Sequence, residues 1–197
     1  MGRNAHFQNE DFIKAVLTIA AEHGPAAVTI TAVAEAVGAP VGSVYHRFPS
    51  RDVLMAEVWL RVVASFQEEY LAFLEKGDGL GAALHTPRWV RRYPVEARIL
   101  LMYRREELVA GDGPESLKFE VQEIARRLSD GVVAFAARTF GRTGREEVGR
   151  IVFATIDAPY AAVLRYIRLG KKPPRAVEDY LTKTYDAIIG GSYEDIQ

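Results

Sequence analysis

Residues 37–54 of the chain, VGAPVGSVYHRFPSRDVL, combine a tight turn with a short helix that carries unfavourable residues. The turn is Gly38-Ala39-Pro40, and the helix is expected over 41–48. An eight-residue helix is not stable alone in water, and its interior glycine, Gly42, costs about 1 kcal/mol relative to alanine. Arg51 stands in the first turn of the next helix, where positive charge opposes the helix dipole by about 0.3–1 kcal/mol. These costs predict that a partner molecule lies across this surface.

The composition of the chain bounds its class. It has 197 residues, of which 49% are apolar, enough for a sizeable core in one large domain or in a small domain joined to a larger one. The net charge of −1 gives no overall attraction to nucleic acid or membrane, so any such affinity must be local. The absence of cysteine excludes a disulfide scaffold, thiolate catalysis and cysteine–zinc sites. With no signal core and no apolar run long enough to span a bilayer, we expect a cytoplasmic protein with no membrane partner.

Apolar residues recur at helical spacing throughout the chain and predict an all-α fold of nine helices. The expected helices are one that contains Phe12 and ends at Gly24, one from Thr29 to Gly38, one over 41–48, one from about 51 to 76, and five over about 80–92, 94–109, 114–140, 145–169 and 175–189. We place a three-helix N-terminal domain at 1–52 and a larger helical domain at 53–197.

The residues around the tight turn fit a helix-turn-helix. Ala34 lets the two helices approach closely, Gly38 can adopt positive φ in the turn, and Val44 docks the following helix. At about 100° per residue, Val41, Val44 and Phe48 are expected to face the core. This packing fixes which residues the short helix presents to its surroundings.

The outward side of the short helix carries groups suited to DNA. Gly42 and His46 are expected to point away from the core, with Tyr45 to one side and Ser43 and Arg47 to the other. A side chain at Gly42 would collide with a closely approaching surface such as the wall of a major groove. His46 and Arg47 offer hydrogen-bond donors there, and the hydroxyls of Tyr45 and Ser43 suit phosphate oxygens.

A DNA phosphate would also account for Arg51, because the free N–H groups of a helix start already attract an anion. The predicted DNA contacts are Thr29, Val41, Gly42, Ser43, Tyr45, His46, Arg47 and Arg51. Simpler interpretations exist for each feature. The glycine could relieve crowding, His46 and Arg47 could be ordinary solvated residues, and Arg51 could pair with Asp52 or Glu57 on its own helix.

This stretch resembles the DNA-binding region of the tetracycline-repressor (TetR) family of bacterial transcriptional regulators. The family pattern is a turn glycine, then Gly-Ser/Thr-aliphatic-Tyr, an aromatic pair ending in Phe, and Ser-Lys-Glu before a leucine. The matching residues are Gly42, Ser43, Val44, Tyr45, Phe48, Ser50 and Leu54, while Arg51 and Asp52 keep the charges of the Lys and Glu positions. Pro40 and Arg47 depart from the pattern, and the motif covers about the first quarter of the chain.

The resemblance implies a ligand-responsive repressor: a homodimer with two DNA-reading heads on a palindromic double-stranded operator, and a C-terminal domain that binds a small-molecule effector. It also implies that the last two helices pair with their copies. The sequence supports this pairing independently, because between Ile151 and Ile167 only Asp157 and Arg165 are charged, so that the helix is apolar nearly all round. The predicted interface residues are Val152, Ile156, Tyr160, Val163, Ile167 and Tyr180.

Aromatic and methionine side chains concentrate in residues 59–135. Most are expected to be core, but as a set they could line an apolar pocket for a hydrophobic or aromatic effector. The candidate ligand contacts are Trp59, Phe66, Tyr70, Trp89, Met102, Tyr103, Phe119 and Asp157. Asp157 is either a ligand contact or, because Pro159 interrupts helical hydrogen bonding, a cap of the resumed helix.

Two other functions compete with DNA-binding regulation. The four histidines, at 6, 23, 46 and 85, have no metal-ligand spacing, and no phosphate loop or nucleophile elbow is present, so we expect no catalytic site, metal or cofactor. The helix-turn-helix could instead serve a protein-interaction adaptor that does not bind DNA. Salt dependence separates these functions, because only DNA binding weakens steeply through counterion release.

Overall fold

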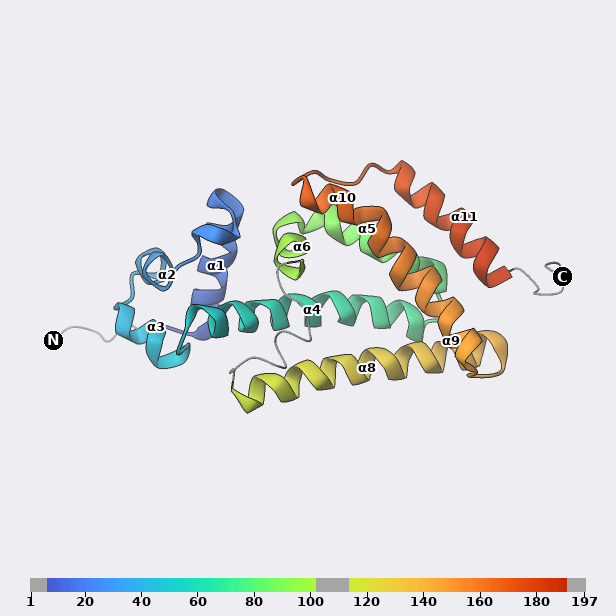
Figure 1. The fold of residues 1–197 in the computed structure, drawn as a ribbon, viewed down its shortest axis with the longest axis horizontal. Helices are drawn as coiled ribbons and strands as arrows, with labels where there is room; N and C mark the ends of the chain where they lie inside the picture. Colours follow the sequence, from blue (N-terminus) through green and yellow to red (C-terminus); the bar gives the residue numbers. More distant parts are fainter. Residues whose placement is uncertain (1–6, 102–113, 191–197) are drawn as a thin grey trace. The chain divides into compact units, whose positions relative to one another are not determined.

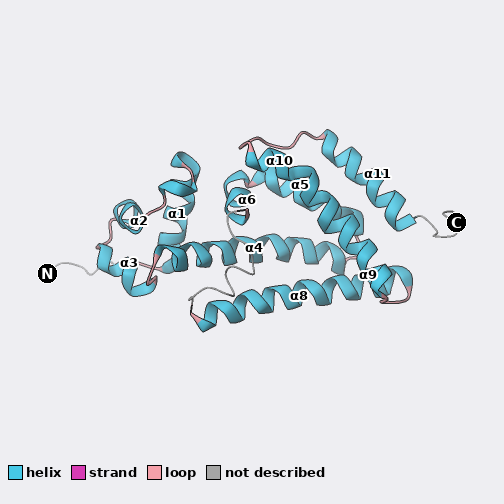
Figure 2. Cartoon of the chain, in the orientation of Figure 1, coloured by secondary structure: helices cyan, strands magenta, loops and turns pink. Residues whose placement is uncertain are grey.

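The computed structural model describes residues 7–101 and 114–190, and every regular element in these ranges is helical (Figure 2). The helices are α1 (Asn9–His23), α2 (Ile30–Val37), α3 (Val41–Arg47), α4 (Arg51–Glu75), α5 (Gly79–Arg92), α6 (Pro94–Leu100), α8 (Glu115–Phe140), α9 (Arg145–Val152), α10 (Ala158–Arg168) and α11 (Ala176–Gly190). A 3-10 turn (Pro25–Ala27) follows α1, and a π-helical turn (Phe153–Asp157) joins α9 to α10 without a break. The all-α prediction is confirmed, and the part of the expected helix 94–109 beyond residue 101 lies outside the described residues.

In α2 and α4 a side chain satisfies one of the free N–H groups of the first turn. Thr29 accepts a hydrogen bond from the Ala32 backbone N–H at 3.0 Å, and Ser50 accepts one from that of Val53 at 3.2 Å. Gly38 ends α2 in the left-handed region, with φ +74°, which only glycine adopts without strain. The turn glycine of the helix-turn-helix is therefore where the sequence predicts it.

The chain divides into two compact units, one of residues 1–62 and 99–121 and the other of residues 63–98 and 122–197. In the first unit α1, α2 and α3 pack around Phe12 and Phe48, whose ring centroids are 6.0 Å apart. We call α1–α3 the head. The second unit has one core around Tyr70, Phe135 and Ile151 and a smaller one around Leu84, Val177 and Leu181.

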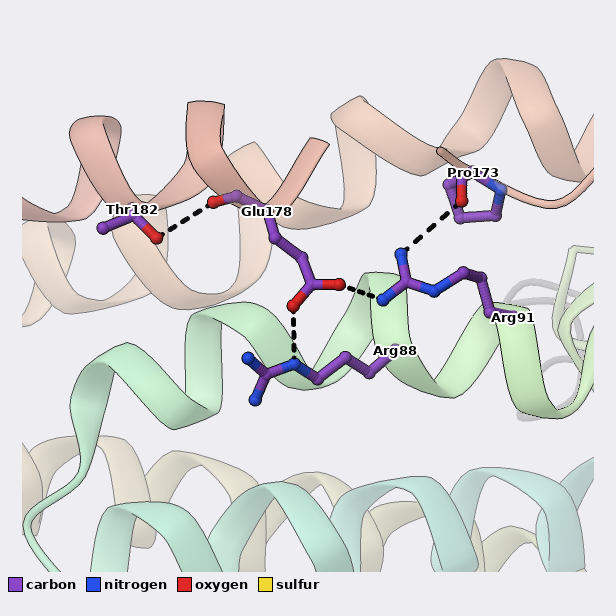
Figure 3. Close-up of polar contacts among 5 residues, drawn as sticks. All are labelled: Arg88, Arg91, Pro173, Glu178 and Thr182. Atoms are coloured by element: carbon purple, nitrogen blue, oxygen red, sulfur yellow. Dashed lines mark hydrogen bonds and ion pairs between the residues drawn. The ribbon is translucent and has the colours of Figure 1, made fainter. Parts of the chain in front are cut away.

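In the second unit α5 packs against both α10 and α11 (Figure 1). A group of charged residues joins α5 to α11, as Figure 3 shows: Glu178 accepts hydrogen bonds from Arg88 at 2.7 Å and from Arg91. Arg91 also reaches the Pro173 carbonyl at 3.5 Å. Burial acts to raise the pKa of Glu178, but the two arginines outweigh it and hold that pKa below its ordinary value. Arg88 and Arg91 therefore hold α5 against α11.

The helix expected over 145–169 passes Pro159 without stopping. Proline lacks the N–H that an α-helix needs at this position, and the chain widens into the π-helical turn just before it. Asp157 is exposed and makes no side-chain capping hydrogen bond, so the prediction that it caps a resumed helix is wrong. The helix does not restart there and needs no cap.

The apolar residues of this helix fall on two faces. Val163 and Ile167 are buried within a single chain, which already accounts for their apolar character. Phe153 and Tyr160 are exposed, at 47% and 48%, as is Tyr180 on α11 at 65%. Of the predicted interface residues, only the exposed and half-buried ones are therefore available to a second chain.

Candidate functional site

The third helix of the head exposes the side that the sequence predicts. Val44 and Phe48 are buried against the head core, while Gly42, Tyr45 and His46 are exposed. Val41 was expected to face inward with them, but it is 39% exposed, because α3 begins at this residue and the core does not extend over its first turn. We call Gly42, Ser43, Tyr45 and His46 the outward face of α3.

Among the described residues, nothing requires Gly42 to be a glycine. A Cβ atom added there would meet no described atom within 4 Å, so crowding by those residues does not explain it. Its backbone is ordinary right-handed helix, which any residue adopts. The glycine lowers the stability of the helix by about 1 kcal/mol relative to alanine. It leaves a surface without a side chain, which a partner can approach closely.

Arg47 turns toward its own chain. Its guanidinium donates to the Ser43 carbonyl at 3.1 Å and to the Phe7 carbonyl at 2.8 Å, and it stacks over the Phe12 ring at 5.4 Å from the centroid. These contacts fix the segment before α1 to the end of α3. Arg47 was predicted to contact DNA, but its donors are used to hold the head together.

Arg51 was predicted to contact a DNA phosphate, and in the structure its guanidinium is bonded to its own chain. Its Nε donates to the Val28 carbonyl at 2.6 Å and its Nη2 to the Pro25 carbonyl at 3.2 Å. An ion pair with Asp52, at 3.6 Å, adds to these bonds. The arginine fork reaches two carbonyl oxygens around the 3-10 turn, and that of Pro25 also accepts the Val28 N–H at 3.2 Å. Arg51 therefore joins the start of α4 to the loop between α1 and α2.

The second unit contains a pocket of about 130 Å³. Its lining residues come from α4, α5, α8, the π-helical turn and α10, and they are Phe66, Gln67, Tyr70, Thr86, Leu128, Thr155, Ile156 and Tyr160. Tyr70 is buried, and its hydroxyl lies 2.7 Å from the Thr155 hydroxyl, which in turn donates to the Ile151 carbonyl at 2.7 Å. Burial raises the pKa of Tyr70 to about 12.

His85 lies behind the Phe66 wall of this pocket. Its Nε2 is 3.1 Å from the Phe66 carbonyl oxygen, and the two rings are 4.7 Å apart. Burial lowers the pKa of His85, and this outweighs the opposing effects of Glu69, 3.9 Å away, and of the Phe66 carbonyl. The imidazole is thus kept neutral beside the pocket wall.

Comparison with known proteins places the head in a family. Residues 12–58, which span α1 to the start of α4, match the family of bacterial regulatory proteins called the tetR family. The head therefore has the sequence pattern of the tetR family. This match supports a DNA-binding transcriptional regulator with a helix-turn-helix.

Two solved structures share the fold of this TetR-family regulator over nearly its whole length. A transcriptional regulator from Rhodococcus sp. Rha1 is 20% identical, with 93% of this chain and 95% of that chain covered at a TM-score of 0.61. The TetR family transcriptional regulator PfmR from Thermus thermophilus is 14% identical, with 91% and 97% covered at a TM-score of 0.57. Among curated proteins, none matches the sequence.

The regulator's predicted ligand residues fall in several places. Phe66 and Tyr70 line the pocket, while Trp89 lies behind it, with its ring 5.1 Å from that of Phe66. Trp59 is buried in the first unit, and Phe119 is exposed. Asp157 is exposed and does not line the pocket, and Met102 and Tyr103 lie outside the described residues.

Sequence reasoning missed the remaining pocket residues. Gln67, Thr86, Leu128 and Thr155 belong to no aromatic cluster, and nothing in the sequence brings them together. Ile156 and Tyr160 were assigned to a dimer interface, yet both reach the pocket. In the parts of the chain that the structure describes, no group of His, Asp or Glu could hold a metal ion and no helix is long and apolar enough to cross a membrane.

Proposed function

We propose that the protein is a homodimeric repressor that leaves its operator when a small apolar effector binds the second unit. The observation that carries this proposal is the pocket, because three of its lining residues, Phe66, Gln67 and Tyr70, belong to α4. The same helix begins at Arg51, which is hydrogen-bonded to the head. An effector that favours one position of α4 would have different affinities for the DNA-bound and free shapes, as release requires.

In this proposal residues 1–52 are the DNA-binding domain and 53–197 the effector-binding and dimerisation domain, acting in the cytoplasm. His46 reads a base edge, Tyr45 and Ser43 contact phosphates, and Gly42 allows α3 to approach the groove. Thr29 adds a phosphate contact at the start of α2. Two heads related by twofold symmetry favour a palindromic operator.

The first step of the test is to sequence the genomic DNA fragments that the purified protein binds. These fragments identify an operator. Fluorescence anisotropy then measures affinity for the operator and for a scrambled duplex at several salt concentrations, with and without candidate effectors. We expect a steep salt dependence for both duplexes and a loss of operator affinity with an effector. His46→Ala should reduce discrimination between the duplexes by roughly 1–3 kcal/mol per half-site. Absence of affinity for either duplex would favour a protein-interaction adaptor, and operator affinity that no pocket ligand changes would refute the effector response.

A further inference from the structure

We propose that the pocket in the second unit selects a small, neutral molecule with one hydroxyl group, a phenol or a cyclic alcohol, which donates its hydrogen bond to Tyr70 Oη. This inference rests on the proposed effector response, for which it names the chemical class of the ligand. The pocket supplies three constraints, which are the direction of one hydrogen bond, the available volume and the absence of charge among the described lining residues.

The direction of the hydrogen bond follows from a chain of three groups. The Ile151 carbonyl can only accept, so the hydroxyl hydrogen of Thr155 is committed to it at 2.7 Å. Thr155 Oγ1 then has only lone pairs left for Tyr70, and the Tyr70 hydroxyl must be the donor in the 2.7 Å contact between them. Tyr70 therefore has no hydrogen to offer a ligand, and its oxygen can only accept.

The chain of hydroxyls is fixed in this direction across the physiological pH range. Thr155 is fully buried and Tyr70 almost so, which favours their protein hydrogen-bond partners over bulk water. Burial keeps Tyr70 protonated, with its pKa raised to about 12. A ligand that offers only an acceptor, such as an ether, would place its lone pairs against those of the Tyr70 oxygen and form no hydrogen bond. A ligand hydroxyl would donate a hydrogen bond to that oxygen.

Volume and charge restrict the ligand further. About 130 Å³ is close to the size of an apolar cavity that holds one benzene ring, so a single ring with one polar substituent fits. None of the eight lining residues is charged, and a carboxylate or ammonium group would lose its hydration without a compensating partner. The site is thus expected to reject acids and amines of the same size.

The test compares ligands of matched size by isothermal titration calorimetry, without DNA. The probes are phenol, which donates and accepts, anisole, which only accepts, toluene, which does neither, and benzoate, which is charged. We expect phenol to bind about two- to tenfold more tightly than anisole or toluene, the range of one net hydrogen bond, and benzoate not to bind. Equal affinity for phenol and toluene, tighter binding of anisole, or no binding of phenol at millimolar concentration would overturn the inference.

Two variants test whether the preference for phenol depends on the hydrogen-bonded hydroxyls of Tyr70 and Thr155. Tyr70→Phe removes the acceptor, so the preference for phenol over toluene should disappear. Thr155→Val frees the Tyr70 hydroxyl to donate, so anisole should gain relative to phenol. Gln67→Leu, at another polar lining residue, is the control and should keep the phenol preference. Circular dichroism and melting temperature check folding; if Thr155→Val does not fold, Tyr70→Phe decides alone.

The experiments can contradict the proposed ligand class without contradicting the proposed function, and the reverse. Phenol selectivity that depends on Tyr70, without any change in operator affinity, would support this inference and refute the effector response. A phenol preference that survives in Tyr70→Phe but is lost in Gln67→Leu would overturn the inference. Operator release by a charged compound would do so as well, although the protein would still be a ligand-responsive repressor.

Discussion

At the scale of one residue, substitutions of Gly42 test whether α3 enters the major groove of DNA. Because a Cβ at this position meets none of the described residues within 4 Å, Gly42→Ala and Gly42→Leu should both fold and raise the melting temperature slightly through better helix propensity. Operator affinity should nevertheless fall in the order glycine, alanine, leucine, with leucine abolishing specific binding. Anisotropy and thermal melts on the same samples measure the two effects. Wild-type operator affinity in Gly42→Leu would mean that this helix does not approach the DNA closely.

Arg51 and Arg61 form a matched pair of arginines on α4 in the first unit. Arg51 holds two backbone carbonyls, whereas Arg61 makes a surface ion pair with Glu10 at 2.8 Å. We expect Arg51→Ala to lower the free energy of unfolding by about 1–3 kcal/mol, since two carbonyls lose charged donors. Arg61→Ala should lower it by less than about 1 kcal/mol.

Urea denaturation measures both variants. Arg51→Lys should not restore stability, because an ammonium group cannot bond both carbonyls with a planar fork. Equal losses for the Arg51 and Arg61 variants would show that the hydrogen bonds of Arg51 contribute little and would return it to the role of a phosphate contact.

At the scale of elements, Glu178 joins α11 to α5 through Arg88 and Arg91. Arg91 is the less exposed of the two arginines, at 22% against 50%, so Arg91→Ala should destabilise the protein more than Arg88→Ala. Glu178→Gln removes the charge and should cost about 2 kcal/mol near neutral pH, because the charged hydrogen bonds are lost. Urea titrations of the variants and wild type at neutral pH provide the measurement.

The pH dependence of this link has a definite sign. The pKa of Glu178 is lowered in the folded protein, so its contribution is fully present above the ordinary glutamate pKa of 4.5 and is lost as the pH falls through the lower folded value. The difference in stability between wild type and Glu178→Gln should therefore be constant at neutral pH and shrink at acid pH, starting near 4.5. A difference that grows on acidification would contradict the arrangement in Figure 3.

At the scale of the whole molecule, the exposed aromatic residues of the last helices are expected to form the dimer. Phe153→Glu and Tyr180→Glu place a charge on exposed positions and should give folded monomers with weaker operator affinity. Phe119→Glu is the control, because Phe119 is 67% exposed but lies on α8 outside the predicted interface. Val163→Glu should instead unfold the chain, since Val163 is fully buried.

Sedimentation equilibrium separates these outcomes. Dimers in both the Phe153 and the Tyr180 variants would place the interface elsewhere, and a monomeric Phe119 variant would move it to α8.

Local signals in the sequence were enough to predict the helices and the turn between α2 and α3. Thr29 and Gly38 act through a hydrogen bond and a dihedral angle within a few residues, so the start and the end of the helix between them could be predicted and are confirmed. The burial of Val44 and Phe48 follows from helical periodicity over the same short range. The outward position of Gly42 and His46 follows from it as well.

The sequence by itself determined the all-α class, the helix-turn-helix and the face that α3 presents, because each depends on neighbours three or four residues away. Only the tertiary structure decided the partners of Arg47 and Arg51, which are carbonyls of residues 40 and 23 positions earlier. It alone decided the pocket too, since Tyr70 and Thr155 are 85 residues apart and meet because separate helices pack together. A long side chain can bond any suitable group within its reach in the folded protein. Its partner therefore depends on tertiary packing and cannot be deduced from the neighbouring sequence.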